Sequence, residues 1–246
     1  MPRLTDPSQI RALLRRDPVW SVYALGDLSP AMFPKTAWFI PGLTLVLRDF
    51  GTSILFAMGA DSVREALDHV TWPVHLQVQA DAFEEVSRHA TITKSLSMIR
   101  MGWTGATPPM VGPGAARLAA SDAEALQHLY ADGSATGEGP DFFFPSMVTD
   151  GVFFGVYEGD ALVAAAGTHL YSPGEGAAAI GNIYTRRDRR GRGLGRLVTS
   201  AVIQALSGIE TVGLNVRADN AAALGLYESL GFVRHCAFYE ALGHKA

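Results

Sequence analysis

The sequence predicts an α/β protein of the α+β kind: a mixed, mostly antiparallel twisted sheet flanked by helices, arranged in two similar halves. Two observations support this prediction. Runs rich in β-branched and aromatic residues alternate with runs of helical periodicity. The order of these runs is nearly the same before and after the middle of the 246-residue chain. No residue-level repeat accompanies that order, so the duplication is inferred from the elements alone. The alternative is an unrelated α+β cap in the first half.

The first half is expected to begin with two helical segments and to continue with three strands. A helix, a strand, a second helix and a final strand follow. The expected helices are 6–16, 19–28, 61–70 and 82–90, and the expected strands are 36–40, 43–49, 53–58, 74–79 and 96–103.

A loop-like stretch, "TGATPPMVGPGA" at 104–115, lies near the middle of the chain. Its three prolines and three glycines disfavour regular structure. We therefore expect an N-terminal domain at 1–103, a linker at 104–115 and a second domain at 116–246.

The second half repeats the pattern with a short strand and a helix at 117–133, where Ser121 and Glu124 have the spacing of a capping box. Two apolar runs around Glu158-Gly159-Asp160 are typical of a hairpin. The remaining expected elements are strands at 177–185, 211–216 and 232–242 and helices at 193–206 and 220–230, the last ended by Gly231 as a left-handed cap.

Composition narrows the classes of protein. The net charge of −4 argues against a general nucleic-acid binder, so any basic surface is local. One cysteine, Cys236, excludes an internal disulfide framework and a multi-cysteine metal site. We find neither an apolar signal region nor a run of about 20 apolar residues that spans a bilayer. These observations favour a cytoplasmic protein with no membrane partner and no metal.

The stretch "TRRDRRGRGLGRLVTSAV", 185–202, holds six arginines and three glycines between a strand and a helix. It contains no Walker loop, and a dinucleotide fingerprint fails because position 196 is arginine. Glycines let the backbone approach an anion closely, and a helix N-terminus adds unpaired donors and partial positive charge. Arginines add charge-assisted contacts. The stretch therefore favours a ligand that carries phosphate.

Two other interpretations of this stretch stay open. A basic, solvated loop at a helix start is common, although arginines there oppose the helix dipole. A nucleic-acid patch is the second, but no aromatic residues interleave the arginines.

The pattern that runs through Arg190, Gly193 and Gly195 resembles the acyl-CoA-binding loop of the GNAT superfamily of N-acetyltransferases. The later stretch "DNAAALGLYESLGF" resembles a second signature of that superfamily, matched by Asn220, Ala223, Tyr227, Gly231 and Phe232. The resemblance covers 117–246, and "GNIYT" and "LNVRADN" are most similar to the glycine-N-acyltransferase-like branch. The first half has no equivalent loop, so the resemblance implies a tandem GNAT protein with a degenerate N-terminal copy.

The resemblance implies how acyl-CoA binds. The strand before the loop pairs its backbone with the pantetheine arm, loop N–H groups and arginines hold the phosphates, and Asn220 bonds the cofactor arm. The implied cofactor-binding residues are Ile183, Tyr184, Thr185, Arg190, Gly191, Arg192, Gly193, Leu194, Gly195, Arg196 and Asn220.

Tyr227 is implied to protonate the departing thiolate, and a phenol of high pKa can do so; otherwise it is a core aromatic. Many relatives carry a glutamate base on the strand before the loop, where this chain has Asn182, which can hold a water. His169 is the best titratable alternative, or a structural histidine. Asn215 and Glu138 are candidates for contacting the substrate, although a loop acid such as Glu138 is commonly just solvated.

These inferences predict an acyl-CoA-dependent N-acyltransferase that moves acetyl from acetyl-CoA to a primary amine on a small molecule or peptide, by direct attack. Cys236 is a poor nucleophile because it lies in an apolar strand. We expect a monomer or homodimer that binds no nucleic acid. The alternatives are a non-catalytic acyl-CoA sensor or interaction module and a nucleic-acid-binding domain.

Overall fold

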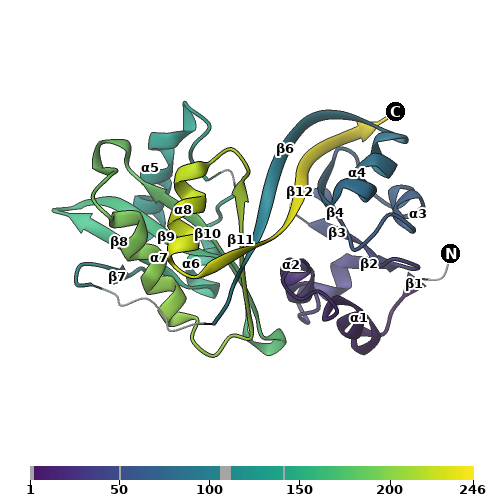
Figure 1. Cartoon of the computed structure of the whole chain (residues 1–246), viewed down its shortest axis with the longest axis horizontal. Coiled ribbons are helices and arrows are strands. Elements are labelled where there is room, and N and C mark those ends of the chain that lie inside the picture. The colour runs from purple at the N-terminus through teal and green to yellow at the C-terminus, as the bar shows by residue number, and fades with distance from the viewer. Residues whose placement is uncertain (1–2, 50, 106–111, 141) are drawn as a thin grey trace. The chain divides into compact units, whose positions relative to one another are not determined.

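The computed structural model describes residues 3–49, 51–105, 112–140 and 142–246, so 106–111 of the predicted linker lie outside the described residues. The chain folds into two compact units. The first comprises 1–102, 215–224 and 234–246, and the second comprises 103–214 and 225–233. Figure 1 gives the labels of the elements. The first unit is therefore built from both ends of the chain.

The first unit contains one sheet in the order β1-β2-β3-β4-β5-β12-β6. Its strands are β1 (Arg3–Leu4), β2 (Thr36–Phe39), β3 (Thr44–Asp49), β4 (Thr52–Ala57), β5 (Val74–Val78), β6 (Ala90–Trp103) and β12 (Phe232–Lys245). The last residue of β6 and the first two residues of β12 belong to the second unit. Neighbours β2, β3 and β4 are antiparallel, and β5 is parallel to β4. The last strand of the chain enters this sheet because residues 239–243 pair antiparallel with β5.

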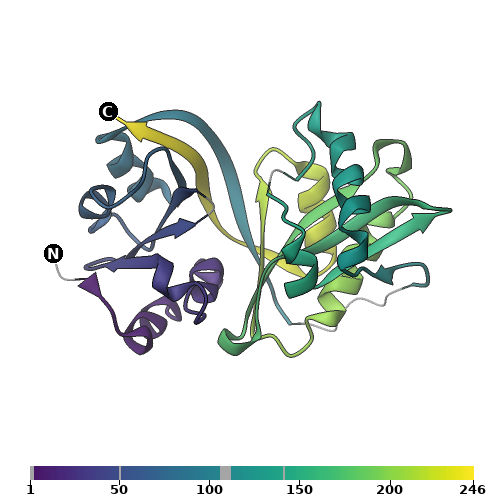
Figure 2. The same ribbon diagram turned by 180° about the vertical axis from the view of Figure 1, so that it is seen from behind.

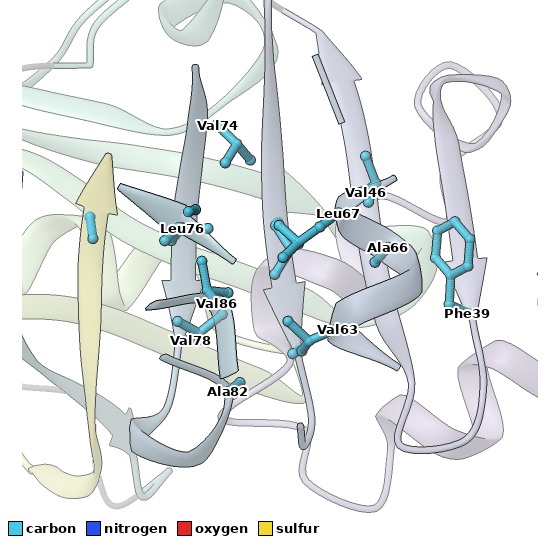
Figure 3. Packing of buried hydrophobic residues seen from close by; sticks show 14 of the residues in the cluster. Phe39, Val46, Val63, Ala66, Leu67, Val74, Leu76, Val78, Ala82 and Val86 are labelled. Atoms are coloured by element: carbon cyan, nitrogen blue, oxygen red, sulfur yellow. The ribbon is translucent and has the colours of Figure 1, made fainter. Parts of the chain in front are cut away.

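The helices of this unit are α1 (Pro7–Leu14), α2 (Val22–Gly26), α3 (Val63–Leu67) and α4 (Ala80–Ser87). Buried residues of α3 and α4, including Val63, Leu67 and Val86, pack on strand residues such as Val46 and Leu76 (Figure 3). Successive strand residues point to opposite faces. The next residue of β4 after the buried Leu55 is Phe56, which contacts Trp20 at a ring distance of 5.1 Å. The segment before α2 therefore covers the opposite face.

The second unit contains strands in the order β11-β10-β9-β8-β7. They are β7 (Ala116–Arg117), β8 (Phe153–Glu158), β9 (Ala161–Ser172), β10 (Ala177–Thr185) and β11 (Thr211–Arg217), whose last three residues belong to the first unit. All neighbours are antiparallel except β10 and β11, which are parallel. Helix α7 (Leu194–Ala205) covers one face, while α5 (Ala123–Ser134) and α6 (Ser146–Asp150) cover the other (Figures 1 and 2). Helix α8 (Ala221–Ser229) precedes β12.

These elements confirm the predicted fold class. Each unit has three antiparallel strands, a helix and a parallel strand in the same order: β2-β3-β4-α3-β5 and β8-β9-β10-α7-β11. The hairpin at 158–161 is also confirmed. Strand β6 is longer than the expected 96–103 because it continues back to Ala90, where α4 has already ended.

The predicted capping box of Ser121 and Glu124 is wrong. The carboxylate of Asp122 instead accepts from the Ala119 N–H at 2.8 Å, and α5 begins at Ala123. The other carboxylate oxygen of Asp122 accepts from the Tyr157 hydroxyl at 2.6 Å. Asp122 therefore contacts β8 and also caps the backbone, in an interaction that begins two residues earlier than the sequence pattern suggested.

Candidate functional site

The glycine-arginine loop follows β10 and enters α7. Gly191 and Gly193 both have φ of +76°, the left-handed region that favours glycine, and Gly193 is the N-cap of α7. A Cβ placed on either glycine meets no heavy atom within 4 Å, so the space beside the loop is open. The first N–H groups of a helix lack intrahelical acceptors and carry partial positive charge. The loop is therefore shaped to bind an anion.

Each arginine of the loop contacts an acceptor in the described chain. Arg190 forms two contacts with the Glu138 carboxylate, both at 3.2 Å. The other contacts are Arg186 to Asp188, Arg187 to Asp132, Arg189 to Glu158 and Asp188, Arg192 to Glu158, and Arg196 to the Ser229 hydroxyl. Carboxylates thus accept from all of these arginines except Arg196.

These contacts lower the pKa values of two acids that face the loop. Hydrogen bonding from Arg190 lowers the pKa of Glu138. The backbone N–H of Arg187 and the Tyr184 hydroxyl lower the pKa of Asp132. Both acids are therefore ionised at neutral pH, and both stabilise the loop in the conformation described.

The end of β10 offers a backbone edge beside the loop. Strand β10 pairs with β9 up to Thr185, but its pairing with β11 covers only Ala177–Ile180. The edge of Ile183, Tyr184 and Thr185 that faces β11 lies beyond that pairing. An extended ligand can add to such an edge through main-chain hydrogen bonds, as the sequence resemblance implies for a pantetheine arm.

Tyr227 lies on α8 with 7% of its surface exposed. Its ring contacts Phe232 in a T-shaped arrangement with a centroid distance of 6.2 Å. Burial raises its pKa to about 12, so the phenol keeps its proton at neutral pH. This side chain can therefore donate a proton but cannot serve as a base there.

Asn182 and His169 lie together where β9 and β10 lose register. Asn182 has φ of +51°, uncommon for a residue other than glycine, and its carbonyl accepts from the Tyr130 hydroxyl at 2.9 Å. The His169 ring packs on Gly181, because a Cβ there would lie 2.5 Å from it. Burial lowers the pKa of His169, and a hydrogen bond with Asn182 opposes that shift. His169 is consequently neutral at pH 7 and able to accept a proton.

Asn220 and Asn215 belong to the first unit. The Asn220 side-chain oxygen accepts from the Ala223 N–H at 3.1 Å and so caps α8. The Asn215 amide donates to a carboxylate oxygen of Glu240 at 3.0 Å. Asn220 and Asn215 therefore belong to a different unit from the loop. Glu138 belongs to the same unit as the loop and contacts Arg190.

Residues 123–232 match the family model "Acetyltransferase (GNAT) family". This segment, called the GNAT domain for that match, covers less than half of the chain. The match spans the glycine-arginine loop, the open edge of β10 and Tyr227, and it ends at Phe232. Both sequence signatures therefore lie within the GNAT domain.

Curated relatives cover parts of the chain. A mycothiol acetyltransferase of Geodermatophilus obscurus is 40% identical over 89 residues, which is 34% of this chain and 29% of that protein. A ribosomal protein bS18-alanine N-acetyltransferase of Salmonella typhimurium is 43% identical over 74 residues, 28% of this chain and 50% of that protein. The chain thus spans at most half the length of these relatives.

A solved structure from the GNAT family, of Novosphingobium aromaticivorans, covers 93% of this chain and 97% of its own with a TM-score of 0.67. At 22% identity, the likeness concerns the fold. Because it extends far beyond residues 123–232, the arrangement outside the GNAT domain also occurs in another protein.

Three residues that shape the loop of the GNAT domain were not predicted from the sequence: Tyr130, Asp132 and Glu158. Tyr130 holds the Asn182 carbonyl, Asp132 accepts from the Tyr184 hydroxyl at 2.8 Å, and Glu158 accepts from Arg189 at 2.6 Å. The sequence placed Tyr130 and Asp132 only within an expected helix and Glu158 only at an expected hairpin.

Over 3–49, 51–105, 112–140 and 142–246, no group of three or more His, Cys, Asp or Glu side chains is arranged to hold a metal ion. No helix in the described part of the chain is long and apolar enough to cross a membrane.

Proposed function

We propose that the chain is an acyl-CoA-dependent N-acyltransferase that moves an acetyl group from acetyl-CoA to a primary amine. The observation that supports it most is the loop: two glycines at φ of +76° with open space beside them, entering α7 within the GNAT domain. Bound acyl-CoA supplies a thioester, whose carbonyl carbon gains the amine nitrogen as the C–S bond breaks.

The residues proposed to bind acyl-CoA fit that ligand. N–H groups from Gly191 to Arg196 bind the pyrophosphate, and Arg190 or Arg192 exchanges its carboxylate partner for phosphate. The free edge of Ile183–Thr185 pairs with the pantetheine arm. Asn220, whose side-chain oxygen caps α8 in the first unit, stays a prediction as a contact of that arm.

Tyr227 is the proposed acid. Its phenol carries the proton that the departing sulfur takes, and burial keeps that proton in place at neutral pH. His169 is the proposed base, accepting the proton that the attacking amine loses, directly or through a water held by Asn182. The lowered pKa of His169 supports this role because the ring is already neutral.

The first unit is proposed to be a second, degenerate GNAT copy. Its strands β2 to β5 and helix α3 repeat the order of the GNAT domain, but α3 is only five residues long. The hydroxyl of Ser62, its N-cap, bonds Thr44 at 2.8 Å and the Phe39 carbonyl at 3.2 Å. Side-chain contacts thus fill the place where the GNAT domain has an open loop.

The acceptor class is proposed to be an amine on a small molecule or a peptide. The name of one relative, a ribosomal protein bS18-alanine N-acetyltransferase, describes N-acetylation of an alanine for that protein. Asn215 and Glu138 stay predictions as acceptor contacts. Placement in the glycine-N-acyltransferase-like branch, a cytoplasmic location and a monomer or homodimer also stay predictions.

The deciding test is calorimetric titration of the whole chain with acetyl-CoA and with CoA, repeated on Gly193→Glu and on the control Gly174→Glu. A Cβ added at Gly174 would meet no heavy atom within 4 Å, and Gly174 lies outside the loop. Binding that Gly193→Glu abolishes and Gly174→Glu preserves supports the site. Absence of binding by the intact protein contradicts the proposal. Binding without turnover on a panel of amines indicates an acyl-CoA sensor instead.

A further inference from the structure

Arg100, on β6 in the first unit, is a fully buried cation at 0% exposure. Its Nε, Nη1 and Nη2 atoms are each buried, and none has a hydrogen-bond partner among the described residues. A guanidinium carries five N–H donors. Buried charged groups are normally paired and hydrogen-bonded because their desolvation is costly. The charge of Arg100 interacts with the carboxylates of Glu240 and Asp17, but its N–H donors lack an acceptor among the described residues.

Aromatic rings cover the guanidinium but leave its donors unmatched. Its central carbon lies 4.8 Å from the ring centroid of Tyr23, 5.1 Å from that of Trp20 and 5.2 Å from that of Phe238. Cation–π contacts of this kind stabilise the charge through ring faces. They do not replace hydrogen bonds to the N–H groups in the guanidinium plane. The rings thus cover the faces of the guanidinium. The N–H groups at its edge stay available to bind an anion.

Asn215 supplies a second unmatched group in the same unit. Its amide nitrogen donates to Glu240, which fixes the orientation of the side chain, and its Oδ1 atom is buried without a hydrogen-bond donor in the described chain. Glu240 is two residues beyond Phe238 on β12, so both side chains point to the same face of the sheet. Glu240 also interacts electrostatically with Arg100. The cation and the amide oxygen therefore share Glu240 as a neighbour.

Partly exposed side chains separate this cluster from solvent. Tyr23, Asn215 and Glu240 are each partly exposed, although Arg100 behind them is not. The donors of Arg100 and the Oδ1 atom of Asn215 are themselves buried, so a small ligand meets them only after one of these partly exposed side chains moves aside. A planar carboxylate matches the guanidinium fork in two parallel hydrogen bonds, and an N–H group matches the amide oxygen.

We propose that Arg100 and Asn215 form a binding site in the first unit for a small ligand that carries a carboxylate and a nearby N–H group, such as an amino acid or its N-acyl derivative. Arg100 binds the carboxylate edge-on inside the cage of Trp20, Tyr23 and Phe238. Asn215 accepts from the N–H group. The site is independent of acyl-CoA binding.

The test is calorimetric titration of the whole chain, without acyl-CoA, using N-acetyl-L-alanine, its uncharged primary amide, and propionate. We expect the acid to bind at least about tenfold more tightly than the amide, because the amide lacks the charge that Arg100 pairs with. Arg100→Met should weaken binding of the acid by about tenfold or more, and Arg100→Lys should weaken it less. Asn215→Leu should weaken the binding of N-acetyl-L-alanine but not the binding of propionate, which has no N–H group.

Arg64→Met is the matched control, since Arg64 is an exposed arginine of the same unit, paired with Asp68. It should leave all three titrations unchanged. Replacing a buried charge by an apolar side chain of similar size is often tolerated, so Arg100→Met should stay folded. If it does not fold, the Asn215→Leu comparison still decides. Equal binding of acid and amide, or no binding up to about 10 mM, overturns the site.

A second experiment tests whether the carboxylate ligand is the acceptor of the acetyl group. Acetyl transfer to L-alanine and to L-alaninamide is compared in the intact chain and in Arg100→Met. A preference for the free acid that Arg100→Met abolishes supports a ligand that is the acceptor. Carboxylate binding without that preference supports a ligand that is not consumed. If the chain binds no acetyl-CoA, the proposed transfer fails, but the calorimetric titration still decides about Arg100.

Discussion

The guanidinium of Arg190 and the carboxylate of Glu138 face each other, with Nη1–Oε1 and Nη2–Oε2 distances of 3.2 Å. Arg190 opens the anion-shaped turn before α7, and Glu138 follows α5, so the pair joins segments that lie 52 residues apart. Both side chains are close to half-exposed. The sequence suggested separate roles for them, one toward the cofactor and one toward the substrate, whereas the structure makes each the partner of the other.

Glu138→Gln should tighten acetyl-CoA binding. The carboxylate competes with phosphate for Arg190, and its removal leaves that arginine to the ligand. Because an exposed ion pair contributes little, we expect a gain of only about two- to fivefold in affinity, measured by calorimetry. Glu124→Gln, which changes an exposed acid on α5 away from Arg190, should have no effect. Weaker binding by Glu138→Gln would show that Glu138 organises the loop rather than competing for it.

Tyr227→Phe should lower kcat for acetyl transfer by about 100-fold and leave KM for acetyl-CoA nearly unchanged, because it removes the proposed proton donor. The ring that packs on Phe232 is kept, so the fold should not change. Steady-state kinetics with acetyl-CoA and an accepted amine measures both constants. An unchanged kcat would return Tyr227 to the role of a core aromatic.

Asp27 should make the first unit less stable as pH rises. Burial, and then the nearby charge of Asp49, raises the pKa of Asp27 from 3.8 to about 8. The folded state thus holds this proton more tightly than the unfolded state. The contribution of Asp27 to the stability of the folded state is therefore greatest below pH 4, and it is lost as pH rises through 8.

Asp27→Asn should remove that loss, so the variant should gain about 1 kcal/mol or more over the natural chain at pH 8 but not at pH 4. Urea unfolding at both pH values measures the difference. Asp160→Asn, at the exposed hairpin of the second unit, serves as the control. An equal effect of Asp27→Asn at both pH values would argue against a raised pKa.

Deleting residues 239–246 should unfold or strongly destabilise the first unit, because residues 239–243 pair with β5 and Ala241 lies in its core. Removing only residues 245–246 should be tolerated, since that pairing stays intact. Urea unfolding followed by circular dichroism compares the two truncations. Equal stability of both would mean that β12 contributes little to the unit.

Local features of the chain were predictable from the sequence. The turn at Gly191–Gly193, the start of α7 and the hairpin at 158–161 depend on a few neighbouring residues, because glycine conformation and helix capping act within one turn of chain. The two signatures of the GNAT domain are local in the same sense. The sequence therefore determined the fold class and the position of the loop that carries the proposed function.

Tertiary structure decided which distant residues meet. The pairing of β12 with β5, of Glu138 with Arg190 and of Arg100 with Trp20, Tyr23 and Phe238 joins segments that no periodicity relates. Arg100 is an instance, because its position in β6 does not indicate which side chains surround it. Which groups surround it depends on how the sheet and helices pack, since side-chain contacts are set by three-dimensional burial and not by spacing along the chain.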